Sequence, residues 1–338
     1  MRDEGPNLPE WIAHHLGAGI GHFLVYSNDC TDGTDHMLDE LAAAGLVTHV
    51  RLRPGRARPV QWQALKDAAR RPELADADWA VVFDCDEFVN LRAPDDGLAG
   101  MLAGLPPGTS ALAMGWRLFG NSGHLRRPAG LTIEGFTRAA PPDIPLPLAH
   151  FCKSFFRPAH FREPGIHRPK RRQGALPRWC DGAGAPLPEP FARSNARINL
   201  FGLNPGHALV QLNHYSLRSA ACFMAKRRRG LPNHTHRDVA LGYWVERNFN
   251  DVEDTSILRM AAQTRAQLAR LLEIGQLGAL LRQAEEHHRA ALEQQLRDED
   301  ENRLFLQLAL AGDSRVPDAA FIASHLRRLK ALNRKTNR

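Results

Sequence analysis

The sequence predicts an α/β protein whose mostly parallel sheet carries helices on both faces, followed by a helical C-terminal region. Three short apolar runs, at 22–27, 46–52 and 79–84, alternate with segments of helical composition. Strands that are apolar along nearly their whole length are typical of parallel sheets buried on both faces. From residue 256 onward leucines recur at helical spacing among charged residues, which predicts helices.

The N-terminal elements follow from local patterns along the chain. In the segment 35–46, Met37 and Leu41 recur at helical spacing, and Asp32 or Thr34 can cap that helix. The other segments are assigned from their apolar or helix-forming composition. The expected order is helix 7–18, strand 22–27, helix 35–46, strand 46–52, helix 60–71 and strand 79–84.

The chain becomes less regular after residue 84. Residues 157–196 carry many Pro, Gly and Arg residues with little periodicity, which indicates a long and partly irregular excursion. We divide the chain into a main domain at 1–245, which includes this excursion, and a helical C-terminal extension at 256–338. The remaining expected elements are a short helix at 94–104, strands at 111–119 and 131–138, the loop 120–124 between them and a proline-rich connection at 139–148.

The composition excludes several classes of protein. With 43% hydrophobic and 24% charged residues, the chain of 338 residues has the balance of a soluble globular protein. No apolar run approaches the ~18 residues of a membrane helix, and the first residues lack the apolar stretch of a secretory signal. The five cysteines are widely spaced without a CxxC pair, so we expect reduced thiols in a cytoplasmic protein.

The net charge of +7 is distributed unevenly along the chain. Residues 1–150 carry 13 Lys and Arg against 19 Asp and Glu, whereas residues 151–180 carry eight basic residues and one acidic residue. A basic segment beside an acidic half indicates an anionic partner, such as a diphosphate, a phospholipid surface or a nucleic acid. A solvated basic loop is the alternative.

Polar clusters follow two of the predicted strands. Residues 28–34 follow the strand 22–27, and Asp84, Asp86 and Glu87 come directly at the end of the strand 79–84. Ligands bind at the carboxyl ends of parallel strands, and residues i and i+2 of a strand project from the same face. Two carboxylates on one face suit Mg²⁺ or Mn²⁺, although acids that only cap the following loop would look the same.

Other proteins with similar acids fit the sequence less well. An EF-hand loop would need glycine where Val89 stands, and a phosphatase with Asp84 as nucleophile would be expected to carry threonine where Phe88 stands. A glycosidase would need two carboxylates that flank the scissile bond, and the sequence does not indicate such a pair. A non-enzymatic binder of nucleic acid or membranes, acting through 151–180 and 226–229, stays open, although those runs lack interleaved aromatic residues.

Several motifs occur in a fixed order around these acids. Arg-Asp-Glu at 2–4 and Ser-Asn-Asp at 27–29 precede "FDCDEF", and the later motifs are "WRLFGNSGH" (116–124), "KSFFRP" (153–158), "GIHRP" (165–169) and "NHYSLRS" with "KRRRG" (213–230). In order and spacing, over roughly residues 1–245, the chain resembles glycosyltransferase family 2, and in particular its bacterial branch related to family 92.

The resemblance implies a GT-A fold, in which a nucleotide-sugar lies across the strand ends of a single α/β domain. It also implies that Asp84 and Asp86 hold Mn²⁺ or Mg²⁺ against the donor diphosphate, with His214 as a further metal ligand. The segment 216–230 would then be either a lid over the donor or a surface helix. The other residues expected to bind the nucleotide-sugar are Arg2, Glu4, Asn28, Asp29, Asp32, Lys153, Arg218 and Lys226.

The acceptor side has weaker signals. Aromatic faces and polar side chains suit sugars, so the candidates are Trp116, Asn121, His124 and His167. A core tryptophan and a histidine satisfied by backbone are the alternatives for the first and the last of these. An inverting mechanism requires a carboxylate base, for which we favour Glu134, with Asp143 behind it. Asp86 is the other residue expected to act in catalysis.

One feature departs from the family pattern. In GT-A enzymes the first β-strand precedes the Arg-Asp-Glu segment, which here begins at Arg2. We therefore expect the first strand of the fold to be missing and, because the neighbouring strands would then have unpaired backbone groups, the chain to be unstable or inactive.

These patterns predict a cytoplasmic, metal-dependent glycosyltransferase of the hexosyltransferase type. It would move a sugar from a nucleoside diphosphate-sugar, foremost a UDP-sugar, to a saccharide or lipid-linked acceptor. Peripheral contact with the inner face of the membrane is compatible with this prediction, and a nucleic acid partner is not expected.

Overall fold

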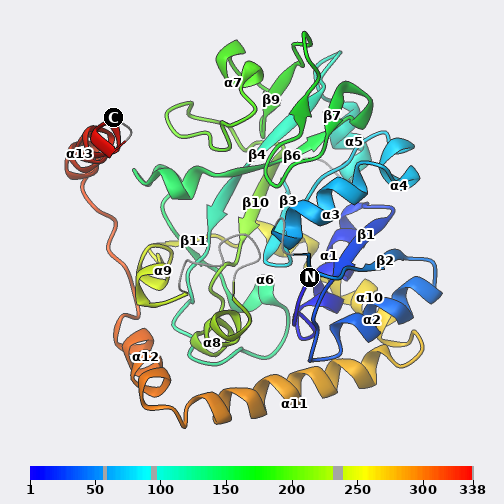
Figure 1. Ribbon diagram of the computed structural model, residues 1–338, viewed down its shortest axis with the longest axis vertical. Coiled ribbons are helices and arrows are strands. Elements are labelled where there is room, and N and C mark those ends of the chain that lie inside the picture. The colour runs from blue at the N-terminus through cyan, green and yellow to red at the C-terminus, as the bar shows by residue number, and fades with distance from the viewer. Residues whose placement is uncertain (56–58, 93–96, 231–238, 337–338) are drawn as a thin grey trace.

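The computed structural model describes residues 1–55, 59–92, 97–230 and 239–336, which contain a mixed α/β core and a helical C-terminal region (Figure 1). The predicted order of elements in the first 70 residues is confirmed. Their bounds are α1 Leu8–Ala18, β1 Phe23–Ser27, α2 Thr34–Ala43, β2 Val47–Arg51 and α3 Val60–Ala68.

The first two strands form a small parallel sheet of their own. β1 pairs with β2 from Phe23 opposite Val47 to Ser27 opposite Arg51. The apolar side chains of α2 that the sequence placed at helical spacing are fully buried, Leu41 among them. Between β1 and α2 the chain turns at Gly33, whose φ of 85° is a conformation that glycine adopts without steric cost.

The predicted strand 79–84 is wrong. Within it only Ala80 makes a strand-like bridge, with Phe156, and the strand β3 begins after the acids and spans Glu87–Leu91. The side chains of Trp79, Val81 and Phe83 instead pack, partly buried, against the core. An apolar run indicates that a segment is buried. It does not indicate whether a neighbouring backbone lies close enough to form a sheet with it, so the run alone could not predict a strand.

The larger sheet is mixed, so the expectation of a mostly parallel GT-A sheet is not confirmed. Its strand order is β3-β10-β4-β6, and β9 also pairs with β4. β10 is parallel to β4 but antiparallel to β3, and β4 is parallel to β9 but antiparallel to β6. The bounds of the strands not yet given are β4 Ala111–Leu118, β6 Cys152–Phe156, β9 Trp179–Asp181 and β10 Val210–His214.

The predicted strand 131–138 is also wrong, because its first part is the short helix α6, Thr132–Gly135. The Glu134 side chain accepts a hydrogen bond from the Leu131 backbone N–H at the start of that helix, and such local capping favours a helical turn over an extended chain. Only Arg138–Ala139 is extended, as β5, which pairs with β11, Val252–Glu253.

The excursion 157–196 has little regular structure but a core of its own. Phe161, Trp179 and Phe191 are buried together against Phe156 of β6. Within the predicted helix 94–104 the structure shows α5, and residues 94–96 lie outside the described residues. The short elements of this half are α4 Pro72–Ala75, α5 Gly97–Ala103, β7 Phe161–Glu163, β8 Lys170–Arg171 and α7 Glu189–Arg193.

The C-terminal region is helical, as predicted, and packs on the rest of the protein. Leu271 and Leu277 belong to the same core as Leu8 and Ile12, and α11 runs along one edge of the molecule past α2 and α8 (Figure 1). Within the described ranges, no helix has both the length and the apolar composition needed to span a bilayer. The helices are α8 Ala220–Arg229, α9 Leu241–Val245, α10 Ala261–Leu272, α11 Leu277–Gln295, α12 Glu299–Leu310 and α13 Ala319–Thr336.

Candidate active site

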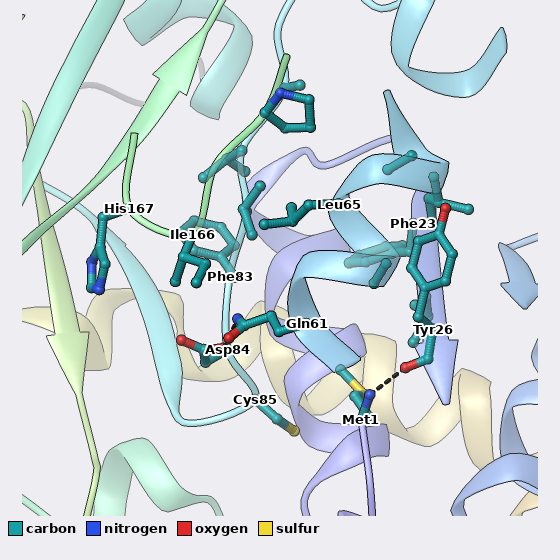
Figure 2. A pocket seen from close by; sticks show the side chains of 18 of the residues that line it. Met1, Phe23, Tyr26, Gln61, Leu65, Phe83, Asp84, Cys85, Ile166 and His167 are labelled. Atoms are coloured by element: carbon teal, nitrogen blue, oxygen red, sulfur yellow. Dashed lines mark hydrogen bonds between the residues drawn. The ribbon is translucent and has the colours of Figure 1, made fainter. Parts of the chain in front are cut away.

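A cavity of about 1610 Å³ lies between the small sheet, α3 and the segment 79–86 (Figure 2). Apolar side chains such as Phe23, Leu65 and Phe83 line one part of it, whereas Asp84 and His167 belong to its polar part. The volume exceeds the ~300–1,000 Å³ of common small-molecule sites. The cavity therefore has room for more than a compact ligand.

The N-terminal residue lies beside β1 at the edge of this cavity. The Met1 amino group donates a hydrogen bond to the Tyr26 carbonyl (Figure 2), and the Asn28 N–H donates to the Met1 carbonyl at 3.1 Å. These two bonds, on either side of Ser27, have the pattern of a parallel ladder. The backbone at Met1 thus runs parallel to β1.

Asp84 is paired with a buried lysine. The Lys153 side chain of β6 is fully buried, and its Nζ lies 2.9 Å from Asp84 Oδ2 and 3.2 Å from Glu87 Oε2. Gln61 of α3 donates to the other Asp84 oxygen at 3.2 Å, and Glu87 accepts from the Asp84 backbone N–H at 2.8 Å. Asp84 is therefore held in place by side chains from β6, α3 and the start of β3.

The protonation states of this group follow from burial and charge. Burial raises the pKa of Glu87 to about 8, although the Lys153 ammonium opposes the shift. Burial also opposes ionisation of Asp84, but Lys153 outweighs it and lowers the pKa of Asp84 below its usual value. At neutral pH, Asp84 thus carries the negative charge that Lys153 neutralises, and Glu87 is largely protonated.

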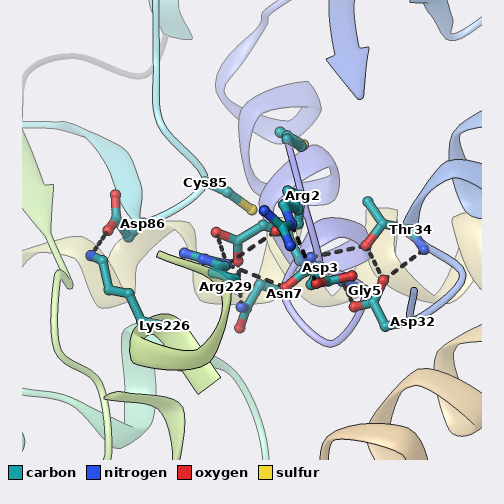
Figure 3. A network of polar contacts seen from close by, with 12 residues as sticks. Arg2, Asp3, Gly5, Asn7, Asp32, Thr34, Cys85, Asp86, Lys226 and Arg229 are labelled. Carbon is teal, nitrogen blue, oxygen red and sulfur yellow. Dashed lines mark hydrogen bonds and ion pairs between the residues drawn. The ribbon is translucent and has the colours of Figure 1, made fainter. Parts of the chain in front are cut away.

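Asp86 has a different cationic partner. Its Oδ2 lies 2.8 Å from Lys226 Nζ of α8 (Figure 3), and its Oδ1 lies 3.6 Å from His214 Nε2 at the end of β10. Burial opposes ionisation, but Lys226 and His214 together hold the pKa of Asp86 well below its usual value. The His214 ring packs against Trp116 in a tilted arrangement, with 3.9 Å between the ring centroids.

The arrangement of donors fits a divalent cation only in part. The two aspartates precede a strand instead of ending one, and each is neutralised by its own lysine. Within the described part of the chain, no three His, Cys, Asp or Glu side chains are grouped to hold a metal ion. Asp86 and His214 face each other closely enough to contribute two ligands, which suits a cation that takes its remaining ligands from phosphate and water.

Arginines of the segment 218–229 contact both the N-terminal motif (residues 2–4) and the acidic turn (residues 84–87). Arg229, at the end of α8, pairs with Glu4 at 2.5 Å, and Glu4 also accepts a hydrogen bond from the Asn7 side chain at 2.8 Å. Arg218 donates to the Cys85 carbonyl at 2.8 Å, between the two aspartates. Segments that are about 80 and 220 residues apart in the sequence thus meet at one edge of the cavity.

The family assignment rests on the first half of the chain. The sequence model of glycosyltransferase family 92 matches residues 5–175, about half of the protein. The chain belongs to glycosyltransferase family 92. The resemblance predicted from the motifs is thereby confirmed, and glycosyl transfer from a sugar donor to an acceptor is favoured over phosphatase chemistry. No curated protein matches the chain.

The matched region of this family 92 glycosyltransferase covers only part of the site. It includes Asn28, Asp84 and Lys153 but ends before His214 and Lys226. The two lysines that neutralise the acids therefore come from inside and outside the matched region. α8, which carries Lys226, packs Phe223 and Met224 against α9 and α12; closure of the segment 216–230 over a donor stays a prediction.

Only some of the residues that the transferase was expected to use for nucleotide binding line the cavity. Arg2, Asn28 and Asp29 line the cavity. Asp32 does not; it accepts hydrogen bonds from the Gly5 and Thr34 backbone N–H groups, from the Thr34 hydroxyl and from His288 of α11 at 2.9 Å. Its function is thus to hold the loop 28–34 against the N-terminal motif and α11.

The expected acceptor residues are divided in the same way. Trp116 and His167 line the cavity, with 5.7 Å between their ring centroids. Asn121 and His124 do not line it: Asn121 donates to the His124 carbonyl at 3.2 Å, and the His124 ring donates to the Gly135 carbonyl at 3.0 Å. These two residues hold the loop 120–124 in place.

The expected catalytic base is not brought to the cavity. Glu134 caps α6 and pairs with Arg265 of α10 at 2.5 Å, and Asp143 is exposed in the proline-rich connection. Neither residue lines the cavity. Sequence order placed Glu134 near the acceptor motif, but the turn at 131–135 points its carboxylate toward α10 instead.

Three residues of the site were missed by sequence reasoning. Glu87, although adjacent to the aspartates, was not assigned a role; its Oε1 accepts a hydrogen bond from the Trp116 indole at 2.8 Å. Tyr243 and Arg247 line the cavity beyond Lys226, and the Arg247 guanidinium lies 3.8 Å from the Tyr243 ring centroid. The proximity of Glu87 to the motif was a usable signal, whereas nothing in the sequence marks Tyr243 or Arg247.

Proposed function

We propose that this family 92 glycosyltransferase transfers a hexosyl group from a nucleoside diphosphate-sugar, foremost a UDP-sugar, to a saccharide or lipid-linked acceptor. The observation that carries the proposal is the pairing of Asp84 and Asp86 with two different lysines at the polar end of the large cavity. A departing nucleoside diphosphate gains negative charge, and preplaced cationic groups stabilise that charge where it develops.

In this proposal Asp86 and His214 hold Mn²⁺ or Mg²⁺, with Asp84 as a third candidate ligand. The cation shields the charge of the diphosphate when it is bound. Lys226, which neutralises Asp86 at 2.8 Å, then exchanges the carboxylate for a phosphate oxygen. Lys153 stays with Asp84 and Glu87 and keeps the turn in position.

The remaining contacts follow from which residues line the cavity. Arg2, Asn28 and Asp29 bind the nucleoside at the end of β1, supported by Glu4 and its partner Arg229. Trp116 and His167 present ring faces to the acceptor. Both substrates are proposed to be reached from the cytoplasm.

Titration calorimetry with UDP, in the presence and absence of Mn²⁺, tests this function. We expect Mn²⁺ to increase the affinity of the wild-type protein and Asp86→Asn to abolish that increase, because the variant loses a charged ligand. Asp300→Asn, an exposed acid of α12, is the matched control and should behave as wild type. Equally weak UDP binding by the wild-type protein under both conditions would contradict the proposal.

A further inference from the structure

The last helix, α13, is strongly basic. Residues 319–336 contain five basic residues and no acidic residue. Residues 312–318, which join α13 to α12, form neither helix nor strand. Figure 1 shows α13 at the periphery of the molecule. The basic residues are Arg327, Arg328, Lys330, Arg334 and Lys335.

α13 also exposes large apolar side chains on one side. Phe321, Leu329 and Leu332 are 62%, 41% and 58% exposed. At 100° per residue these three positions fall within an arc of about 80°. On an ordinary surface helix such a stripe faces the core, so its exposure marks a contact surface.

The described basic side chains lie mainly away from that stripe. Arg327 and Lys330 project from the opposite side of the helix, and Arg328 lies at the edge of the apolar arc; all three are exposed. A helix with an apolar stripe, a basic opposite face and low overall hydrophobicity is suited to the interface of a lipid bilayer. The absence of acidic residues from α13 matches a negatively charged membrane.

We propose that α13 binds the surface of an anionic phospholipid membrane. The helix lies in the plane of the interface, with Phe321, Leu329 and Leu332 among the acyl chains and the basic side chains at the headgroup phosphates. Because Phe321, Leu329 and Leu332 are already exposed, the helix can bind without displacing the core. The proposal depends on α13 alone and does not depend on the proposed reaction.

Flotation of the full chain with lipid vesicles tests the proposal. We expect binding to vesicles of phosphatidylcholine with about one third phosphatidylglycerol, and at least tenfold weaker binding to phosphatidylcholine alone. The double variant Leu329→Asp/Leu332→Asp should lose at least tenfold in affinity for the anionic vesicles. Arg327→Gln/Arg328→Gln/Lys330→Gln should lose affinity and also most of the dependence on salt.

Leu306→Asp is the matched control, since Leu306 is an exposed leucine of α12 (56%) outside α13. It should bind anionic vesicles as the wild-type protein does, and thermal unfolding of each variant verifies that the fold is kept. Equal binding by wild type and by Leu329→Asp/Leu332→Asp would overturn the proposal. So would a wild-type protein that ignores vesicles but forms oligomers that Leu329→Asp/Leu332→Asp disperses, because the stripe would then be a protein interface.

Discussion

At the scale of single residues, the site is defined by which acid shares which cation. Lys153 is fully buried between Asp84 and Glu87, whereas Lys226 neutralises Asp86. Glu87 also fixes the Trp116 indole at 2.8 Å. We therefore regard Glu87 as a positioning residue, since it orients a cavity-lining ring and the acidic turn without needing to touch a substrate.

The raised pKa of Glu87 predicts a pH dependence of stability. Its ordinary value of 4.5 rises to about 8 in the folded protein. Between these values the folded state binds a proton that the unfolded state has lost, so the free energy of unfolding falls as pH rises, by up to about 1.4 kcal/mol per pH unit. Denaturant unfolding between pH 5 and 8 should show this slope, and Glu87→Gln should flatten it.

Identical slopes for wild type and Glu87→Gln would show that Glu87 ionises normally. The Trp116 hydrogen bond should survive in the variant, because the amide oxygen can still accept it.

Removal of the Lys153 charge should destabilise the protein strongly. Lys153→Met removes a fully buried ammonium and leaves the Asp84 carboxylate, whose side chain is 41% exposed, without its cation, which costs roughly 1–3 kcal/mol. Lys66→Met is the matched control: Lys66 also pairs with a glutamate, Glu163, but its side chain is 44% exposed, so the expected cost is about 0–1 kcal/mol. Urea denaturation at pH 7 measures both, and equal effects would refute the assigned role of Lys153.

At the scale of elements, the least expected result concerns the segment 79–84 and its neighbour β1. Both line the same cavity without pairing with each other. Met1 already makes the two hydrogen bonds of a parallel ladder around Ser27. A chain continued from the Met1 nitrogen would therefore run alongside β1, into a space lined by Phe23, Val25 and Phe83.

An apolar strand added at that point should stabilise the protein. Fusion of about six alternating valine and isoleucine residues before Met1 would fill apolar space and pair with β1 on the side away from β2. We expect the melting temperature to rise by at least about 2 °C, which corresponds to roughly 1 kcal/mol for a domain of this size. A glycine-serine extension of equal length is the control, and an equal effect of both extensions would contradict this view of the cavity.

At the scale of the whole molecule, the C-terminal helices are joined to the core to different degrees. His14 of α1 is hydrogen-bonded to Thr264 of α10 at 3.0 Å, and Leu271 and Leu277 are buried in the main core. α13 contributes one buried apolar side chain, Ile322. The region after residue 256 is thus partly core and partly appendage.

Two truncations separate these parts. A chain that ends at residue 255 should lose cooperative unfolding, because Leu8 and Ile12 lose their cover from α10 and α11. A chain that ends at residue 318 lacks only α13 and should melt within a few degrees of the full chain. Calorimetry of both distinguishes the outcomes: a cooperative transition in the shorter chain would show that residues 256–338 are a separate extension.

Local patterns in the sequence were enough to identify several elements. The apolar spacing of α2 and the β-rich composition of β1 and β2 identified these elements, and the ordered motifs identified the family. The same information placed Asp84 and Asp86 at a site that lines the cavity. Periodicity succeeds here because each of these features depends on residues a few positions apart.

Strand direction and the partners of the acids became known from the folded chain. Lys153 lies 69 residues from Asp84, and Lys226 lies 140 residues from Asp86. Strands that are buried on both faces, such as β3 and β10, need side chains that are apolar or hydrogen-bonded inside the protein. This need is the same for parallel and antiparallel neighbours, so the composition of a strand does not reveal its direction. Ion pairs and sheet ladders join distant segments, and their formation depends on how those segments pack, which no local pattern records.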